Sequence, residues 1–592
     1  MLNFNELENR SIFLMALLIC VITLLGLRTF YVQIIQGGKH YKESADIRAR
    51  NIPALAPRGI VYDRRGKILA LNKPRYDAYL IPSEVNELTL HETLDFAQRV
   101  LKVDSYNIKK EYEKKKVKTF EPIEIKKFLN MKEVSILEEN KERYPELVVS
   151  PMPVRYYPYK NMCAHVLGYV GKISKEEWKK KQKGKEGYIL GDVIGKLGIE
   201  ESYDNFIRGI NGGRQIEVDA HGTSIRTMKS VNPIPGNNIY LTIDVDMQKT
   251  ARELIGKEKG SVVVMDVKNG EVLALVSKPD FDPNMFSKKL TKWQWAHLRR
   301  QSHPLHNRAI TAFPPGSIFK VVTLWAALER LKNLNRKFYC PGYYWIGRRK
   351  ADCWRPEGHR KISLFWGLIE SCDIVFYTLG RELGEINGAD TMHEFAKKYG
   401  LGEKTNIALR GEEAGSIPTS KWKLKRFNTH WYPGDSINMA IGQGFVTTSP
   451  LQMAALIAAI ANGSDVFQPK LVRKISSVDG TVKLLDIDPI VRKKLDIKEE
   501  HLSFIRRGLR KVVTDGTGRA VSWAEITIAG KTGTAEDNPR PKPHAWFICY
   551  APYEKPQIAI AVFLQNAGHG GSHAAPIARE LVNWYYKYRM KK

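Results

Sequence analysis

The stretch TAFPPGSIFKVVTLWAALERL, Thr311–Leu331, places a lysine inside an otherwise apolar run. The Pro-Pro-Gly tripeptide before Ser317 predicts a turn, with a helix beginning at or just after it. Ser317 then lies in the first helical turn, where backbone N–H groups have no intrahelical partner. Lys320 follows three residues later and lies on the same face of that helix.

Burial of Lys320 would explain this pattern chemically. A lysine in apolar surroundings loses solvation, so its pKa falls toward neutrality. A neutral amine beside a hydroxyl can act as the general base for a serine nucleophile. The Ser-x-x-Lys pattern is weak by itself, because Ser420–Lys423 repeats it in PTSKWKLKR. That second copy is mostly polar, so we expect it to be a solvated surface.

Two later motifs favour the Ser317 copy. ESCDIVFYTLG carries Ser371 and Asp373 two residues apart, and IAGKTGTAE carries Lys531–Thr534. The apolar residues before the second motif and the glycine within it predict the end of a strand. The order along the chain is Ser-x-x-Lys, then Ser-x-Asp, then Lys-Thr-Gly, which is far more specific than any one motif.

This ordered triple resembles the signature of penicillin-binding proteins and serine β-lactamases. Three further segments resemble parts of class B penicillin-binding proteins, so that the resemblance covers nearly the whole chain. They are PRGIVYDRRGKILA at Pro57–Ala70, GKLGIEESYD at Gly195–Asp204 and GQGFVTTSPLQMA at Gly442–Ala454. Asp373 stands where most members carry asparagine, and elongation-type members resemble the chain in having aspartate there.

The resemblance implies acyl transfer on peptidoglycan. Ser317 would attack the D-Ala–D-Ala carbonyl of a stem peptide, and an amine of a neighbouring stem would complete the cross-link. The implied activity is that of a serine-type D-Ala-D-Ala transpeptidase or carboxypeptidase, which β-lactams acylate as substrate mimics. The implied catalytic residues are Ser317, Lys320, Ser371, Asp373 and Lys531, and the implied substrate-binding residues are Thr532, Gly533 and Thr534. The backbone N–H groups of Ser317 and Thr534 would stabilise the oxyanion.

The secondary-structure pattern predicts an α+β fold. Gly260–Ser277 reads as two strands joined at Asn269-Gly270, and three more strands lie near the C-terminus. Helical stretches separate these groups, which indicates one antiparallel sheet flanked by helices. We expect a cytoplasmic tail and transmembrane anchor at 1–35, a mixed non-catalytic pedestal (dimerisation-like) domain at 36–236 and a transpeptidase domain at 237–592.

The N-terminus predicts a membrane anchor. Ser11–Leu27 carries no charge, and the small-residue cleavage site of a signal peptide is missing. The net charge of +30 suits an anionic membrane surface or wall polymer, and the chain lacks the motifs of nucleic-acid binding. The positive-inside rule would place the bulk of the chain in the cytoplasm. The resemblance instead implies a single-pass protein of the bacterial inner membrane with its catalytic domain outside.

The cysteines suggest a metal site. Cys340, Cys353, His359 and Cys372 supply three sulfurs and one imidazole, which match a closed tetrahedral zinc site. A Cys340–Cys353 disulfide and a chance cluster are the alternatives. Elongation-type relatives resemble the chain in placing metal-ligand residue types at matching points, which favours a structural zinc. The acyl-transfer chemistry itself needs no cofactor, and Cys20, Cys163 and Cys549 are expected to pack as apolar residues.

The resemblance also implies partners. These are a separate membrane glycosyltransferase of the shape, elongation, division and sporulation family, and the elongation scaffold. Three alternatives remain: a β-lactamase or β-lactam sensor on the same fold, a structural subunit with a vestigial site, and a septal rather than elongation-type enzyme.

Overall fold

The computed structural model describes residues 4–38, 49–86, 88–115, 122–183, 187–189, 191–218, 224–287, 290–300, 303–332, 335–536 and 542–591. Over these residues the chain forms two compact units. The first unit comprises Met1–Pro57, Lys73–Val154 and Gly209–Pro235, and the second comprises Arg58–Asn72, Arg155–Arg208 and Gly236–Lys592.

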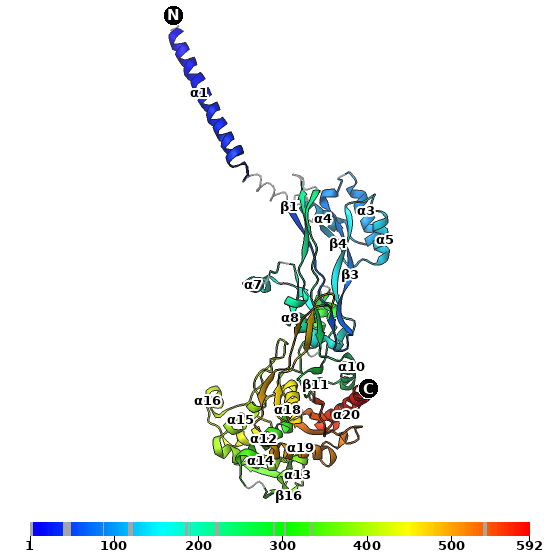
Figure 1. Cartoon of the computed structure of the whole chain (residues 1–592), viewed down its shortest axis with the longest axis vertical. Coiled ribbons are helices and arrows are strands. Elements are labelled where there is room, and N and C mark those ends of the chain that lie inside the picture. The colour runs from blue at the N-terminus through cyan, green and yellow to red at the C-terminus, as the bar shows by residue number, and fades with distance from the viewer. Residues whose placement is uncertain are drawn as a thin grey trace. The chain divides into compact units, whose positions relative to one another are not determined.

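The N-terminal helix α1 spans Phe4–Phe30 and continues as one π-helical turn at Tyr31–Ile35 (Figure 1). Its segment Ile12–Ile35 is the only helix among the described residues that is long and apolar enough to cross a membrane, and none of it is buried. The predicted apolar N-terminal helix is therefore present.

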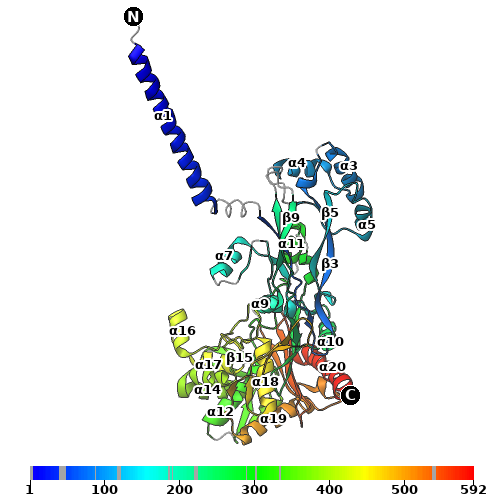
Figure 2. The same ribbon diagram turned by 45° about the horizontal axis from the view of Figure 1, so that its top comes forward.

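The rest of the first unit is a mixed α/β body with a small core. In Figure 2, β3 and β5 run beside each other, and β4 pairs with β3. Leu80, Leu94, Leu101, Ile123 and Leu137 are buried together in this core. A separate antiparallel sheet has the strand order β1-β8-β9. The bounds are β1 Ala49–Ala54, β3 Ile68–Leu80, α3 Leu90–Leu101, α4 Ser105–Lys115, β4 Ile123–Lys126, α5 Met131–Glu139, β5 Leu147–Tyr156, β8 Gly212–Val218 and β9 Ser224–Val231.

The main sheet of the second unit has five antiparallel strands in the order β12-β11-β23-β22-β21. Strands from both ends of this unit's sequence thus meet in one sheet. The bounds are β11 Gly260–Asp266, β12 Val272–Lys278, β21 Ala529–Ala535, β22 His544–Ala551 and β23 Ile558–Leu564. This sheet and its helices confirm the predicted α+β class.

Both faces of this sheet are covered by helices. Along β11, Val263 and Met265 pack in the same cluster as the apolar helix α18 (Pro450–Asn462), whereas Val262 and Val264 pack with α10 and α20. Successive side chains of a strand point to opposite faces, so a strand buried on both faces is apolar throughout. This explains why β11, β12, β22 and β23 have largely continuous apolar sequences rather than alternating ones.

Helix α12, whose residues Lys320–Ala327 are all buried, packs on α14, α15 and α19. Figure 1 shows α12, α14 and α15 gathered together, and α17 packs on α14. The helix bounds are α10 Val245–Ile255, α12 Lys320–Arg330, α13 Leu364–Ile369, α14 Asp373–Asn387, α15 Asp390–Lys398, α16 Ser420–Phe427, α17 Pro433–Ala440, α19 Glu499–Thr514 and α20 Ala575–Tyr585.

Short strands and helices complete the unit. Two hairpin-like pairs, β13 with β16 and β14 with β15, precede α13. The bounds of the smaller elements are β2 Val61–Tyr62, β6 Val170–Lys172, α7 Lys175–Lys183, β7 Val193–Gly195, α8 Gly198–Ser202, α9 Asp204–Ile207, β10 Asn238–Leu241, α11 Lys292–Arg300, β13 Lys337–Cys340, β14 Tyr343–Ile346, β15 Arg349–Asp352, β16 Arg360–Ser363, β17 Asp465–Phe467, β18 Val472–Ser476, β19 Lys483–Asp486 and β20 Val491–Lys494.

A buried ionic network joins the N-terminal segments of the second unit. Glu200 accepts hydrogen bonds from Arg58 (2.8 Å) and Arg155 (2.5 Å), and Arg58 also donates to Asp204 (2.7 Å). All four side chains are at most 7% exposed. Although burial alone would raise it, the pKa of Glu200 lies below its usual range because of the two guanidinium groups. The carboxylate is thus ionised and fully committed to this network.

We predict that Glu200→Gln lowers the free energy of unfolding by about 3–5 kcal/mol, because it leaves two buried guanidinium groups short of one charge. Glu394→Gln is the control, since Glu394 pairs with Arg330 at the surface and its loss should cost less than about 1 kcal/mol. Urea denaturation measures both.

The wild type and Glu200→Gln also test how the stability contributed by Glu200 depends on pH. The depressed pKa of Glu200 stabilises the fold above its unfolded value of about 4.5, and this contribution is lost as the pH falls through the folded pKa. The difference between wild type and Glu200→Gln should therefore shrink in acid. An equal difference at pH 7 and at the acid limit would contradict the assignment.

Candidate active site

Ser317 lies in a tight turn that packs against strand β21. Gly316–Phe319 forms a 3-10 turn and the α-helix begins only at Lys320, so the helix starts later than the sequence suggests. Gly316 has φ of +59°, and a Cβ at this position would lie 2.4 Å from the backbone oxygen of Thr534. The Gly316 N–H donates to the Gly442 carbonyl oxygen at 3.0 Å. Glycine is thus required here, and the half-buried Ser317 follows directly.

Lys320 is fully buried, as predicted, but it has a counter-charge. Its Nζ donates to Asp373 Oδ1 and to the Ser371 carbonyl oxygen, both at 2.8 Å, and to Ser371 Oγ at 3.2 Å. The sequence predicts the burial of Lys320 but not the Asp373 carboxylate that lies against its amine.

Ser371 Oγ lies between two lysines. The second lysine, Lys531 on β21, donates from its Nζ to Ser371 Oγ at 2.8 Å. Burial, together with repulsion from Lys320, holds the pKa of Lys531 well below its usual range against the opposing attraction of Asp373. The hydroxyl therefore links one amine that has a carboxylate partner to a second amine whose proton is weakly held.

The rest of the Lys-Thr-Gly motif lies in the middle of β21, Ala529–Ala535, and not at a strand end as the sequence suggested. Thr532 is buried, and its hydroxyl shares a hydrogen bond of 2.6 Å with that of Thr517. Gly533 packs within van der Waals reach of the Ser317 turn, since a Cβ there would lie 2.9 Å from Ile318. Thr534 is half-buried, and its Oγ1 accepts from the Gly570 N–H at 3.5 Å. Thr517 lies outside the sequence motifs, so no sequence pattern indicated that it belongs to this site.

The second Ser-x-x-Lys copy differs from its predicted environment. Lys423 is only 7% exposed, so the expectation of a solvated lysine is wrong. It forms an ion pair with Asp435 at 2.5 Å and lies over the ring of Tyr432. Its neighbours Lys421, Lys425 and Arg426 are exposed as expected. The polar neighbours of Lys423 gave no sign of this buried ion pair, because its partner Asp435 comes from another helix, α17.

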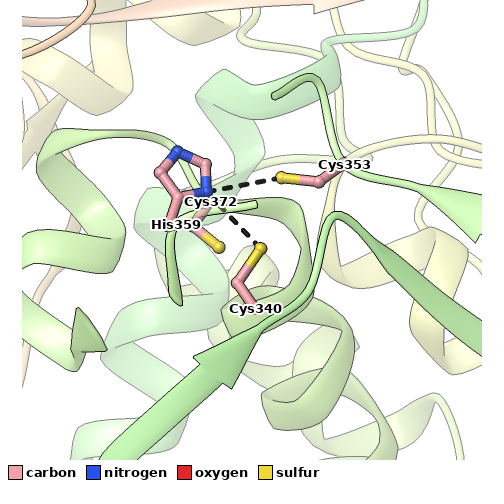
Figure 3. Close-up of side chains that lie close together, drawn as sticks. All are labelled: Cys340, Cys353, His359 and Cys372. Carbon is pink, nitrogen blue, oxygen red and sulfur yellow. Dashed lines mark hydrogen bonds between the residues drawn. The ribbon is translucent and has the colours of Figure 1, made fainter. Parts of the chain in front are cut away.

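The predicted metal ligands converge in one place. The ligand atoms of Cys340, Cys353, His359 and Cys372 all lie within 4.8 Å of one another. In Figure 3 the Nδ1 atom of His359 faces the sulfurs of Cys340 and Cys353, at 3.5 and 3.6 Å. All the described cysteines are free thiols, so the alternative Cys340–Cys353 disulfide is not formed. Cys372 points into this cluster and away from the lysines, as expected from its place between Ser371 and Asp373.

The thiols of the cluster differ in acidity. A hydrogen bond from Cys372 lowers the pKa of Cys353 to about 3, and the same bond raises that of Cys372 well above its usual range. Burial raises the pKa of Cys340. A thiolate is the form of cysteine that binds metal, and the lowered pKa of Cys353 favours that form.

Family models match both parts of the chain. Residues 260–583 match the penicillin binding protein transpeptidase domain, and residues 53–241 match the penicillin-binding protein dimerisation domain. The chain therefore belongs to the penicillin-binding proteins.

Individual relatives point to one branch of this family. The chain is 33% identical over 589 residues to the peptidoglycan D,D-transpeptidase MrdA of Haemophilus influenzae, covering 95% of this chain and 89% of that protein. Penicillin-binding protein 2 of Helicobacter pylori, solved in complex with MreC, has a TM-score of 0.78 at 28% identity, covering 92% and 100% of the two chains.

A second solved structure is similar over almost the full length. It belongs to a peptidoglycan synthase complex that coordinates polymerisation and cross-linking, and it has a TM-score of 0.73 at 27% identity, covering 98% and 99% of the two chains. These matches confirm the prediction of an elongation-type penicillin-binding protein of the transpeptidase class.

We predict that Gly316→Ala lowers the rate of acylation by a penicillin about 100-fold, because the new Cβ displaces the Ser317 turn from β21. Gly66→Ala is the matched control. Gly66 also has a positive φ, +84°, but its Cβ would meet open space, so only the backbone strain of about 1–2 kcal/mol is added. Fluorescent-penicillin labelling measures both, and an equal loss in the two variants would contradict the role of the close contact.

Proposed function

We propose that this chain is a membrane-anchored peptidoglycan D,D-transpeptidase of cell-wall elongation that acts through an acyl-enzyme on Ser317. The observation that carries the proposal is the convergence of three distant segments on one hydroxyl. Lys320 and Lys531 both donate to Ser371 Oγ, and Lys320, which lies three residues after Ser317, also donates to Asp373. Family membership adds to this geometry, and relatives such as the Haemophilus protein carry the same activity in their names.

In the proposed reaction, Ser317 Oγ attacks the carbonyl of the D-Ala–D-Ala bond. Lys320 takes the serine proton, and Ser371 passes a proton to the leaving amine of the last D-alanine. Asp373 orients Lys320, to which it is hydrogen-bonded at 2.8 Å. A stem-peptide amine then attacks the acyl-enzyme and forms the cross-link. Water in place of that amine gives carboxypeptidase activity.

The substrate's two negative groups have separate partners in this proposal. The developing oxyanion lies on the backbone N–H groups of Ser317 and Thr534, whose fixed positions need little reorganisation. The terminal carboxylate binds Lys531, Thr532 and Thr534. Gly533 keeps β21 close to the Ser317 turn, because any larger residue would meet Ile318. β-Lactams enter the same site as substrate mimics.

We also propose the placement of the chain in the cell. α1 crosses the inner membrane once, residues 36–236 form the pedestal, and residues 237–592 carry out the chemistry on the outer side. A separate glycosyltransferase of the shape, elongation, division and sporulation family supplies glycan strands, and the elongation scaffold is a further partner. The complexes formed by the similar Helicobacter protein and by the peptidoglycan synthase support these partners.

We predict a single stable penicillin adduct on Ser317, detected by intact-mass spectrometry and peptide mapping of the full chain in detergent. Ser317→Ala should abolish it, because the nucleophile is lost. Ser420→Ala should leave it unchanged, since Lys423 is already paired with Asp435.

Other outcomes separate the alternatives. An adduct that vanishes within seconds would indicate a β-lactamase, whereas a folded chain without any adduct would indicate a structural subunit. Rescue of rod shape by the Ser317→Ala chain would also favour the structural role.

We further propose that the four-residue cysteine–histidine cluster holds a structural zinc ion. Zn–S bonds of about 2.3 Å require ligand atoms a little under 4 Å apart, close to the spread within 4.8 Å found here. Three sulfurs and one nitrogen complete a tetrahedron, which leaves no position for water. The ion would tie Cys340 and Cys353 to the back of the Ser371–Asp373 segment through Cys372.

We predict about one zinc per chain by elemental analysis of protein purified without chelators. Cys372→Ser should lower the zinc content and the melting temperature together, because it removes one of four ligands. Cys163→Ser is the control, since Cys163 is a buried free thiol outside the cluster. Absence of stoichiometric zinc in the unmodified chain would refute the site.

A further inference from the structure

The turn that carries Ser371 is strained. Ser371 has φ of +53°, a left-handed conformation that is uncommon for residues other than glycine. Such a conformation is unfavourable and persists only where the surroundings hold it. Two backbone bonds from the end of α13 contribute: the Ser371 N–H donates to Leu368, and the Cys372 N–H donates to Gly367. Neither bond reaches the side chain of Asp373.

Trp354 forms hydrogen bonds with both ends of the turn. Its backbone N–H donates to Asp373 Oδ2 at 3.0 Å, and its indole Nε1–H donates to the Glu370 carbonyl oxygen at 2.8 Å. Glu370 and Asp373 are the residues that flank Ser371 and Cys372. One residue from a different segment of the chain therefore fixes the beginning and the end of the strained turn.

Core packing does not account for this tryptophan. Its side chain remains 54% exposed, so much of its apolar surface is in contact with solvent. Its ring meets His359 in an edge-on contact with the centroids 5.6 Å apart. What distinguishes Trp354 from the exposed Trp366 on α13 is the pair of directional hydrogen bonds to the turn.

The contact to Asp373 reaches the reacting groups. One carboxylate oxygen of Asp373 accepts from Trp354 and the other accepts from Lys320. Asp373 therefore connects Trp354 to Lys320, whose Nζ also donates to Ser371 Oγ.

We propose that Trp354 is a positioning residue for acylation, which holds the Ser371–Asp373 turn in register with Lys320 through its indole and backbone N–H groups. The inference rests on the proposed function, because it concerns the step in which Ser317 is acylated. Trp354 need not touch the substrate for this role.

The test uses side chains that separate the hydrogen bond from the ring. Trp354→Phe keeps an aromatic ring and the backbone N–H but removes the indole N–H. Trp354→His places the Nε2–H of its five-membered ring where the indole N–H was. Trp366→Phe is the control, because Trp366 lies outside these contacts. Each variant of the full chain is mixed with a fluorescent penicillin, and the non-covalent dissociation constant and the acylation rate constant are measured separately.

We expect Trp354→Phe to lower the acylation rate constant about tenfold, the loss of one well-placed hydrogen bond, with the dissociation constant changed less than twofold. Trp354→His should recover part of the rate, and Trp366→Phe should match the unmodified chain. Melting temperature and zinc content should be the same in all variants, because the turn's environment and the cysteines are retained.

Three results would overturn the inference. They are unchanged acylation in Trp354→Phe, a loss that Trp354→His does not relieve, and a loss that parallels a fall in melting temperature or zinc content. Failure of the proposed function is distinguishable, since the unmodified chain would then form no adduct on Ser317.

Discussion

Two buried lysines share one serine hydroxyl, and the geometry of the site depends on that constraint. Moving an ammonium group out of water is costly unless a counter-charge or hydrogen bonds replace the solvent. Asp373 supplies one negative charge, and it lies against Lys320 rather than Lys531. Lys531 is left with Ser371 Oγ and a backbone oxygen as partners. The low pKa of Lys531 follows from this arrangement, because the buried amine has no carboxylate of its own to stabilise the charged form.

Much of this arrangement follows from the sequence. The ordered motifs predicted which residues meet. The apolar runs predicted the strands of the five-stranded sheet to which β21 belongs. The cysteine–histidine cluster was also predictable, since three cysteines and one histidine match the ligand set of a structural zinc site. These predictions succeeded because each depends on local periodicity or on residue types with few chemical uses. The assignment of individual roles to Ser317 and its neighbours remains a prediction.

The remainder depends on tertiary contacts that no local pattern encodes. Lys423 seemed solvated because its partner Asp435 lies on another helix. Thr517 belongs to the site only because its hydroxyl forms a hydrogen bond with that of Thr532. Backbone atoms form further hydrogen bonds that cannot be predicted from side-chain identity. The Gly442 carbonyl holds the Ser317 turn, and the Trp354 N–H holds Asp373. A residue that acts through its main chain leaves no chemical signature in the sequence.

The segment Ser371–Cys372–Asp373 serves two sites at once. Its first and third side chains meet Lys320, while the second enters the cysteine–histidine cluster. Such a segment can exchange side chains but cannot change its length. An insertion or deletion of one residue would turn a thiol toward the lysines and a carboxylate or hydroxyl toward the sulfurs. An engineered loop in the second unit therefore has to be inserted outside Ser371–Asp373.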